Sequence, residues 1–199
     1  KELIDASSVN LIISGGNSPN FFLKKLSTKK KILKKINIFL SDERLVDKKS
    51  EFSNYNHLKS NLKKSKIFSP QDFKNNRNKK KKFFNKLKNK KVISIIGIGE
   101  DGHYASIFNN SKKIKSLIDT KKKPNILITE KIGKPKLRRV TVNLSTILLS
   151  KKIFIIINTQ QKKKLFIKCI KNKLNPLYSL VKYSNDNLLI YNAKSLKRI

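Results

Sequence analysis

Short runs of β-branched and aliphatic residues recur along the chain, and segments of helical length separate them. The clearest runs span residues 9–14, 36–40, 92–96 and 153–158. Such runs are typical of strands buried on both faces, because helices cover both sides of a parallel sheet. Strands that alternate with helices in this way predict a layered α/β domain with a mostly parallel sheet.

The segments between these runs complete the expected layout. Further strands are predicted at residues 125–130, 139–142 and 188–191, and helices at 20–26, 54–62, 75–91 and from Gln160 through Ile170. The chain contains neither an internal repeat nor a convincing linker, so residues 1–199 are expected to form one domain. Because the sequence has no methionine, we expect it to lack its extreme N-terminus.

The run at 92–96 ends in a loop that combines glycines, an acid and a histidine. Gly97, Gly99 and Gly102 allow sharp turns and close approach of the backbone to a ligand. Histidine titrates near neutrality and can take up and return a proton, and Asp101 lies two residues before His103. Open α/β sheets bind ligands at the carboxyl edge of their strands, so the loop predicts an active site.

The first run ends in the turn Ser14-Gly15-Gly16-Asn17-Ser18-Pro19, which precedes a predicted helix. Successive backbone N–H groups and a helix N-terminus together form a natural cradle for a phosphate. A plain connector between strand and helix is the alternative interpretation of this turn.

Charged residues also lie at the ends of two other predicted strands. Asp42-Glu43-Arg44 follows the run at 36–40, where an acid could orient Arg44 as a fixed cation beside a substrate; alternatively, the chain simply reaches water there. Arg139 begins a predicted strand and is one of only five arginines among 48 basic residues. Lys162 is a weaker candidate, because lysine is so abundant in this chain.

The net charge of +36 raises the possibility of a nucleic-acid or membrane partner. Lysine, asparagine and isoleucine all have AT-rich codons, however, and proteins that recognise nucleic-acid bases favour arginine over lysine. Compositional bias is therefore the preferred explanation of the high charge. We expect no specific nucleic acid and no membrane partner, since no apolar run approaches the about 20 residues of a membrane span.

The single cysteine, Cys169, favours a cytoplasmic setting. The two histidines do not form a metal-ligand set, and His57 is interpreted as a structural residue.

Taken together, the motifs resemble those of the 6-phosphogluconolactonase family, within the superfamily of glucosamine-6-phosphate deaminases and isomerases. The matching segments are Ser14-Gly15-Gly16-x-Ser18-Pro19, Asp42-Glu43-Arg44, Ser53-Asn54-Tyr55, Gly97-x-Gly99-x-Asp101-Gly102-His103-x-Ala105-Ser106-x-Phe108 and Arg139-x-Thr141. The resemblance implies a three-layer, Rossmann-like, mostly parallel sheet with helices on both faces. It also implies that a monomer or weak homo-oligomer hydrolyses a phosphorylated sugar lactone without metal or cofactor.

The resemblance further implies roles for individual residues. His103 would be the general base, Asp101 would orient it, and Arg44 would lie near the reacting carbonyl. The residues implied in binding the substrate or its phosphate are Gly15, Gly16, Asn17, Ser18, Asp42, Gly99, Arg139 and Lys162.

The chain departs from the family pattern in places. Asn17-Ser18 stands where Ser-Thr is usual, Tyr104 replaces a threonine, and Thr159 takes the position of a glycine before Lys162. An aminosugar-6-phosphate deaminase or isomerase is the nearest alternative. Those enzymes carry tyrosine at the position of Arg44 and a glutamate after the histidine loop, which this chain lacks. A basic nucleic-acid-binding protein and a catalytically inactive relative remain further alternatives.

Overall fold

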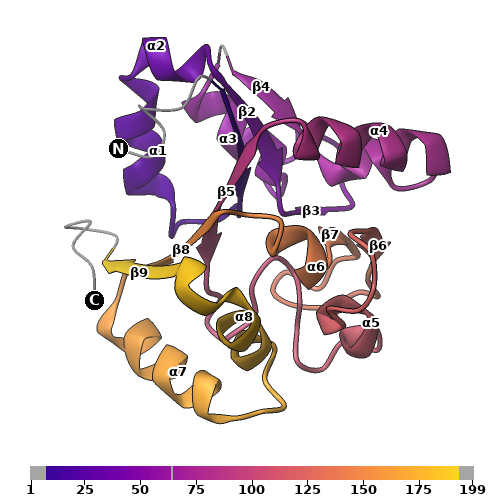
Figure 1. Ribbon diagram of the computed structural model, residues 1–199, viewed down its shortest axis with the longest axis vertical. Helices are drawn as coiled ribbons and strands as arrows, with labels where there is room; N and C mark the ends of the chain where they lie inside the picture. The colour runs from indigo at the N-terminus through magenta and orange to yellow at the C-terminus, as the bar shows by residue number, and fades with distance from the viewer. Residues whose placement is uncertain (1–7, 64, 193–199) are drawn as a thin grey trace.

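The computed structural model describes residues 8–63 and 65–192, which form two sheets and the helices around them (Figure 1). The larger sheet has six strands in the order β4-β2-β1-β5-β8-β9, and each neighbouring pair is parallel. Its strands are β1 (Val9–Ile13), β2 (Ile36–Leu40), β4 (Lys66–Phe68), β5 (Lys91–Gly97), β8 (Lys152–Ile157) and β9 (Leu188–Asn192). The prediction of a mostly parallel sheet is therefore confirmed.

Helices cover both faces of this sheet. They are α1 (Asn20–Ser27), α2 (Lys30–Leu33), α3 (Asn54–Asn61), α4 (Arg77–Lys88), α5 (Ile114–Ile118), α6 (Leu144–Ile147), α7 (Gln160–Lys171) and α8 (Pro176–Ser184), with 3₁₀ turns at Pro70–Phe73 and Asn185–Asn187.

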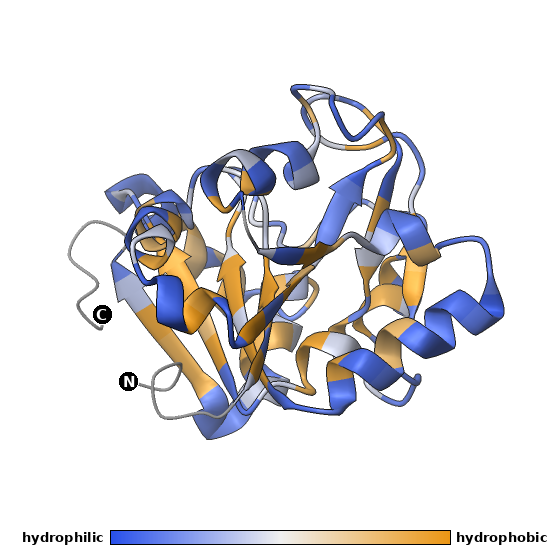
Figure 2. Ribbon diagram, turned by 90° about the horizontal axis from the view of Figure 1, so that it is seen from above, coloured by the Kyte–Doolittle hydropathy of each residue, from blue (hydrophilic) through white to orange (hydrophobic). Residues whose placement is uncertain are grey.

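Alternate residues of each strand enter opposite hydrophobic clusters, as the two-residue period of a strand requires. In β1, Leu11 and Ile13 pack with Leu23 of α1 and Leu58 of α3. Ile12 belongs to the other cluster, which contains the apolar residues of α4 to α8. Figure 2 shows the result: the strands are hydrophobic and central, whereas hydrophilic residues lie along the outer sides of the helices. The expected three-layer arrangement is confirmed.

The smaller sheet is antiparallel and was only partly expected. It contains β3 (Asp42–Arg44), β7 (Arg139–Val142) and β6 (Ile126–Ile128), in the order β3-β7-β6. Strands at β6 and β7 were predicted, but residues 42–44 were expected to be a loop. They form a strand because they pair with β7 in register, with Glu43 opposite Val140.

Five further helices and strands were missing from the expected layout: β4, α2, α5, α6 and α8. The first four are only three to five residues long, too short for a periodic pattern to identify. Helix α8 does carry local start signals: Asn175 caps it by accepting from the N–H of Leu177 at 2.9 Å, and Pro176 follows in the first turn. The predicted helix at 75–91 is shorter than expected, because it ends at Lys88 and Lys91 already begins β5.

Candidate functional site

A polar cleft opens where the carboxyl ends of β1 and β5 meet the smaller sheet. Its volume is about 140 Å³. The sequence-predicted site residues that line it are Gly15, Gly16, Asn17, Ser18, Asp42, Arg44, Gly99, His103, Arg139 and Lys162. Asp101 is the one predicted residue outside the lining, and its carboxylate is hydrogen-bonded to the His103 ring. The fold thus brings the segments after β1, β2, β5 and β8 together at the carboxyl edge of the parallel sheet, and Arg139 at the start of β7 joins them from the smaller sheet.

His103 is held by contacts on two sides. Its Nδ1 atom is hydrogen-bonded to the Asp101 carboxylate, and its ring stacks on Phe108 with the centroids 4.0 Å apart. A carboxylate only accepts, so Nδ1 carries the proton in the neutral ring and Nε2 has a lone pair available. Burial raises the pKa of Asp101, but the hydrogen bond and charge of His103, with backbone donors, outweigh this effect and lower that pKa. The pair therefore has the geometry of an imidazole base oriented by a carboxylate.

Gly99 lies against the imidazole, which explains why this position has no side chain. A Cβ atom at Gly99 would lie 2.1 Å from Cε1 of His103, well inside van der Waals contact. The backbone N–H of Gly99 donates to the carbonyl of His103 at 2.8 Å, so the loop folds back on itself. Gly102 has a φ of +85°, a conformation that suits glycine, and it supports the same turn.

Two arginines from the smaller sheet face the cleft together. Arg44 of β3 is the register partner of Arg139 of β7, and Asp42, two residues before Arg44, lies on the same face. Arg139 is only 3% exposed, and its guanidinium donates to the carbonyls of Ile132 and Pro135, each at 3.2 Å. Burial lowers the pKa of Arg139 most, and Arg44 lowers it further, whereas Asp42 opposes the shift. Like charges held this close favour an anionic ligand.

Asp42 is fixed by neighbouring hydroxyls. It is 7% exposed and accepts hydrogen bonds from Ser41 at 2.9 Å and from Ser106 at 2.5 Å. Ser106 and Ala105 have φ values of +54° and +46°, a conformation that costs free energy for residues other than glycine. The Ala105 carbonyl accepts from the Thr141 hydroxyl of β7, which holds this turn against the smaller sheet.

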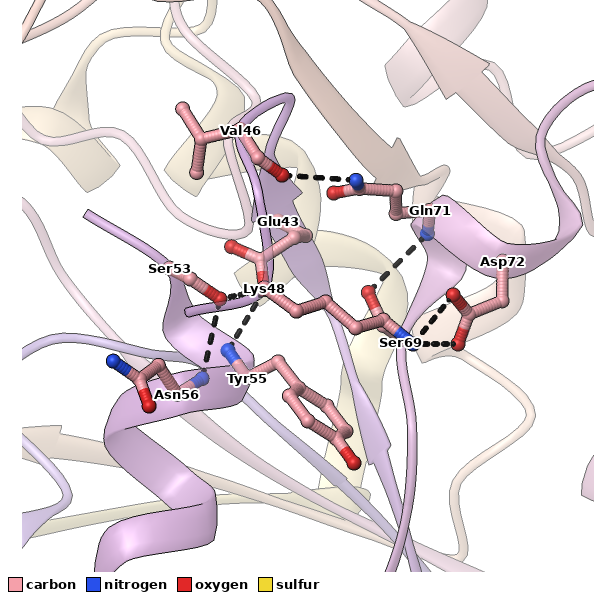
Figure 3. Close-up of polar contacts among 9 residues, drawn as sticks. All are labelled: Glu43, Val46, Lys48, Ser53, Tyr55, Asn56, Ser69, Gln71 and Asp72. Carbon is pink, nitrogen blue, oxygen red and sulfur yellow. Dashed lines mark hydrogen bonds and ion pairs between the residues drawn. The ribbon is translucent and has the colours of Figure 1, made fainter. Parts of the chain in front are cut away.

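An acid of the Asp42-Glu43-Arg44 segment was expected to orient Arg44, but Glu43 makes other contacts. Glu43 is 1% exposed and points to the opposite face of β3, where it accepts from the backbone N–H groups of Asn54 and Tyr55 at 2.8 and 2.7 Å. Figure 3 shows the Glu43 carboxylate at the start of α3, beside Ser53 and Tyr55. Burial raises the pKa of Glu43, and Asp42 adds to this, although the backbone donors oppose it. Glu43 therefore anchors α3 to β3.

The side chain that contacts the Arg44 guanidinium is Asn54, which was not among the predicted site residues. Its Oδ1 atom accepts from Nη1 of Arg44 at 2.5 Å, and it lines the cleft. It does lie in the Ser53-Asn54-Tyr55 motif, but nothing local marks its side chain as part of the site. Ser14, Gly97, Ile98, Ala105 and Ser106 also line the cleft, although no individual role was predicted for them.

The glycine turn and α7 meet at the other end of the cleft. Gly16 has a φ of +79°, which suits glycine and leads the chain into α1. Ser18 is 6% exposed, and the Nζ atom of Lys162 donates to its hydroxyl at 3.3 Å. Thr159 caps α7 by accepting from the N–H of Lys162 at 3.1 Å. Burial lowers the pKa of Lys162, which Glu100 partly offsets.

The remaining histidine lies outside the cleft lining. Nε2 of His57 is 2.9 Å from Oδ1 of Asn20, so it links α3 to α1 as a structural residue would. Across residues 8–63 and 65–192, His, Cys, Asp and Glu side chains form no group of three or more that could hold a metal ion. Within the same part of the chain, none of the helices combines the length and apolar character that crossing a membrane requires.

Comparison of the sequence with those of known proteins identifies relatives of this chain. A 6-phosphogluconolactonase of Helicobacter pylori is 30% identical over 179 residues, which cover 86% of this chain and 76% of that protein. One from Thermotoga maritima is 27% identical over 188 residues, covering 89% of this chain and 82% of that protein. The family model for glucosamine-6-phosphate isomerases/6-phosphogluconolactonase matches residues 1–189.

Solved structures agree on the fold. The crystal structure of the Thermotoga maritima 6-phosphogluconolactonase superposes with a TM-score of 0.75 at 22% identity, covering 96% of this chain and 87% of that one. The Trypanosoma brucei 6-phosphogluconolactonase gives a TM-score of 0.71 at 21% identity, covering 96% and 88%. With the family model spanning nearly the whole sequence, the chain belongs to the glucosamine-6-phosphate isomerase/6-phosphogluconolactonase family.

Proposed function

We propose that this chain hydrolyses 6-phospho-D-glucono-1,5-lactone to 6-phospho-D-gluconate, a step of the oxidative branch of the pentose phosphate pathway. Relatives at 30% and 27% identity are named 6-phosphogluconolactonase. The observation that carries the proposal is that the Asp101-oriented His103 shares one cleft with Arg44, Arg139 and Lys162. A base and several cations in one small site suit an anionic ester.

The proposed reaction uses water as the nucleophile and needs no metal. A lactone is an activated ester, so its hydrolysis requires a base for the water and stabilisation of the oxyanion. Nε2 of His103 removes a proton from the water as its oxygen attacks the carbonyl carbon. The imidazolium, stabilised by Asp101, then protonates the ring oxygen as the C–O bond breaks. The Arg44 guanidinium lies near the developing oxyanion or the sugar hydroxyls.

The proposed phosphate site lies at the glycine turn. The N–H groups of Gly15 and Gly16, the side chains of Asn17 and Ser18, and the Lys162 ammonium form one group of donors, because Lys162 already contacts Ser18. Arg139 adds a buried guanidinium from the smaller sheet. Asp42 accepts from substrate hydroxyls, and Gly99 lets the substrate and His103 approach closely. Fixing the phosphate positions the ester carbon for attack.

The setting of the reaction belongs to the same proposal. We place it in the cytoplasm, with the chain acting as a monomer or weak homo-oligomer on a small-molecule substrate. A single cysteine allows this sequence no internal disulfide, which fits a reducing compartment.

A direct assay tests the activity. Purified protein is given freshly generated 6-phosphogluconolactone in one reaction and glucosamine 6-phosphate in another, with the spontaneous hydrolysis rate subtracted. We expect lactone hydrolysis and no release of ammonia from the aminosugar. Ammonia release without lactone hydrolysis would instead identify an aminosugar-6-phosphate deaminase, and no turnover of either compound would identify an inactive relative.

A further inference from the structure

The side chain of Asn54 is buried among three segments of the cleft. It is 3% exposed and is the first residue of α3. Its Oδ1 atom accepts from Nη1 of Arg44 at 2.5 Å, and its Nδ2 atom donates to the carbonyl of Asp42 at 3.0 Å. Both ends of the carboxamide are thus bound to β3, the strand that carries two of the proposed substrate contacts.

The contact with Asn54 is one of two that Nη1 of Arg44 makes. The same Nη1 atom also donates to the carbonyl of Phe52 at 3.1 Å. Two acceptors, one just before α3 and one in its first residue, therefore hold one end of the guanidinium. The Nε atom of Arg44 is buried and has no hydrogen-bond partner among the described residues. A buried donor without a partner is costly, so the position of this guanidinium is held by its Nη1 contacts against that cost.

Gly15 packs against the other side of the same carboxamide. A Cβ atom at Gly15 would lie 2.0 Å from Oδ1 and 2.1 Å from Cγ of Asn54. The φ of Gly15 lies outside the left-handed region, so glycine is required there for space and not for conformation. Asn54 therefore sets the separation between the glycine turn and β3.

We propose that Asn54 is a positioning residue that holds the Arg44 guanidinium in its working orientation and fixes the Gly15–Gly16 turn beside it. It acts through Arg44 and the turn, and it does not itself take part in the chemistry. This inference rests on the proposed lactone hydrolysis, because the rate is one of its two readouts.

The kinetic test uses Asn54→Ala, with Asn56→Ala as its matched control. Asn56 lies on the same helix, and its amide donates to Lys49 and Ser50 outside the cleft. We expect Asn54→Ala to lower kcat/KM by about 10–100-fold, since a small misplacement of a site group has effects of that order. Asn56→Ala stays within about twofold. Combining Asn54→Ala with Arg44→Ala should add little to the loss from Arg44→Ala alone.

The second readout does not depend on activity. The sequence contains only five arginines, so their side-chain Nε–H resonances can be resolved by ¹⁵N NMR, and Arg44→Lys assigns the one from Arg44. We expect the Arg44 resonance to shift or broaden in Asn54→Ala and to remain unchanged in Asn56→Ala. Gly15→Ala offers a second way to displace the carboxamide, should Asn54→Ala fold poorly, and is expected to move the same resonance.

The outcomes separate this inference from the proposed function. If the wild type does not hydrolyse the lactone, the proposed function fails, while the Arg44 resonance still decides whether Asn54 positions Arg44. An unchanged Arg44 resonance in both Asn54→Ala and Gly15→Ala overturns the positioning role. A displaced Arg44 resonance with an unchanged rate of hydrolysis overturns the link between Asn54 and catalysis. So does a double variant whose loss of kcat/KM equals the product of the two single losses, because Asn54 would then act independently of Arg44.

Discussion

Arg44 and Arg139 lie opposite each other in the antiparallel pair of β3 and β7, with both side chains at the cleft. Residues directly opposite on one face of a sheet are close neighbours, and like charges there destabilise the pairing. The fold retains this arrangement at the place where the proposed substrate brings its negative charge. A bound anion would relieve the repulsion.

This pairing predicts that inorganic phosphate stabilises the protein. We expect the melting temperature to rise with phosphate and to saturate, because a ligand that binds only the folded state raises the free energy of unfolding. Arg139→Ala should show a smaller rise than the wild type. Thermal unfolding with sodium chloride at matched ionic strength is the control, and an equal rise with chloride would contradict a specific anion site.

Lys162→Met should weaken binding of the phosphorylated lactone. Loss of one charged donor changes affinity by about 1.5–3 kcal/mol, which corresponds to roughly a 10–100-fold higher KM. The kcat is expected to stay within a few-fold, and Lys164→Met, an exposed neighbour in α7, serves as the control. Steady-state kinetics on the phosphorylated lactone and on the corresponding lactone without the 6-phosphate checks this. An equal loss on the unphosphorylated lactone would argue against a phosphate contact.

His103→Ala should reduce kcat by roughly two to four orders of magnitude, the usual contribution of a general base. His57→Ala provides a histidine control, because His57 contacts Asn20 outside the cleft lining. Turnover is measured on fresh lactone, and circular dichroism verifies folding. Near-wild-type turnover by His103→Ala would remove the base assignment.

Gly99→Ala tests whether the imidazole needs the space above this glycine. Its new Cβ would lie 2.1 Å from Cε1 of His103, so the ring must move away from Asp101 or from Phe108. Gly99 does not have a positive φ, so we expect little backbone strain and mainly a loss of kcat. Crystallography of the variant would show the displaced ring. An unmoved ring with a lower melting temperature would point to a purely structural effect.

Asp101→Asn should change how stability depends on pH. The pKa of Asp101 is lowered in the folded state from its ordinary value of 3.8, so its carboxylate stabilises the fold above that pH. The contribution is lost as the pH falls through the lowered pKa. Because the Asp101 side chain is 59% exposed, we expect an advantage of under about 1 kcal/mol over Asp101→Asn at pH 7. Urea unfolding should show this difference narrowing below pH 3.8.

The central strands could be predicted because their signal is local. In β1, β2, β5 and β8 most residues are apolar and buried, so the run itself identifies the strand. Residues 42–44 carry no such signal, since three consecutive charged residues have low strand propensity. They become β3 only through pairing with β7 from much later in the chain.

The site divides in the same way. Glycines, an acid and a histidine at strand ends identified the cleft and most of its lining, because parallel strands in one sheet deliver their carboxyl ends to a common edge. The hydrogen-bond partner of Arg44, Asn54, could not be identified from such local signals. Glu43 is adjacent in sequence but points to the other face of the strand, where it anchors α3.

Local pattern therefore specifies the central strands and most of the longer helices, and it indicates which strand ends carry reactive groups, since burial periodicity and capping act over a few residues. Contacts such as Arg44 with Asn54, Arg44 opposite Arg139 and Lys162 with Ser18 arise only when distant segments pack. Their geometry depends on sheet register and helix docking, which are set by burying the shared core.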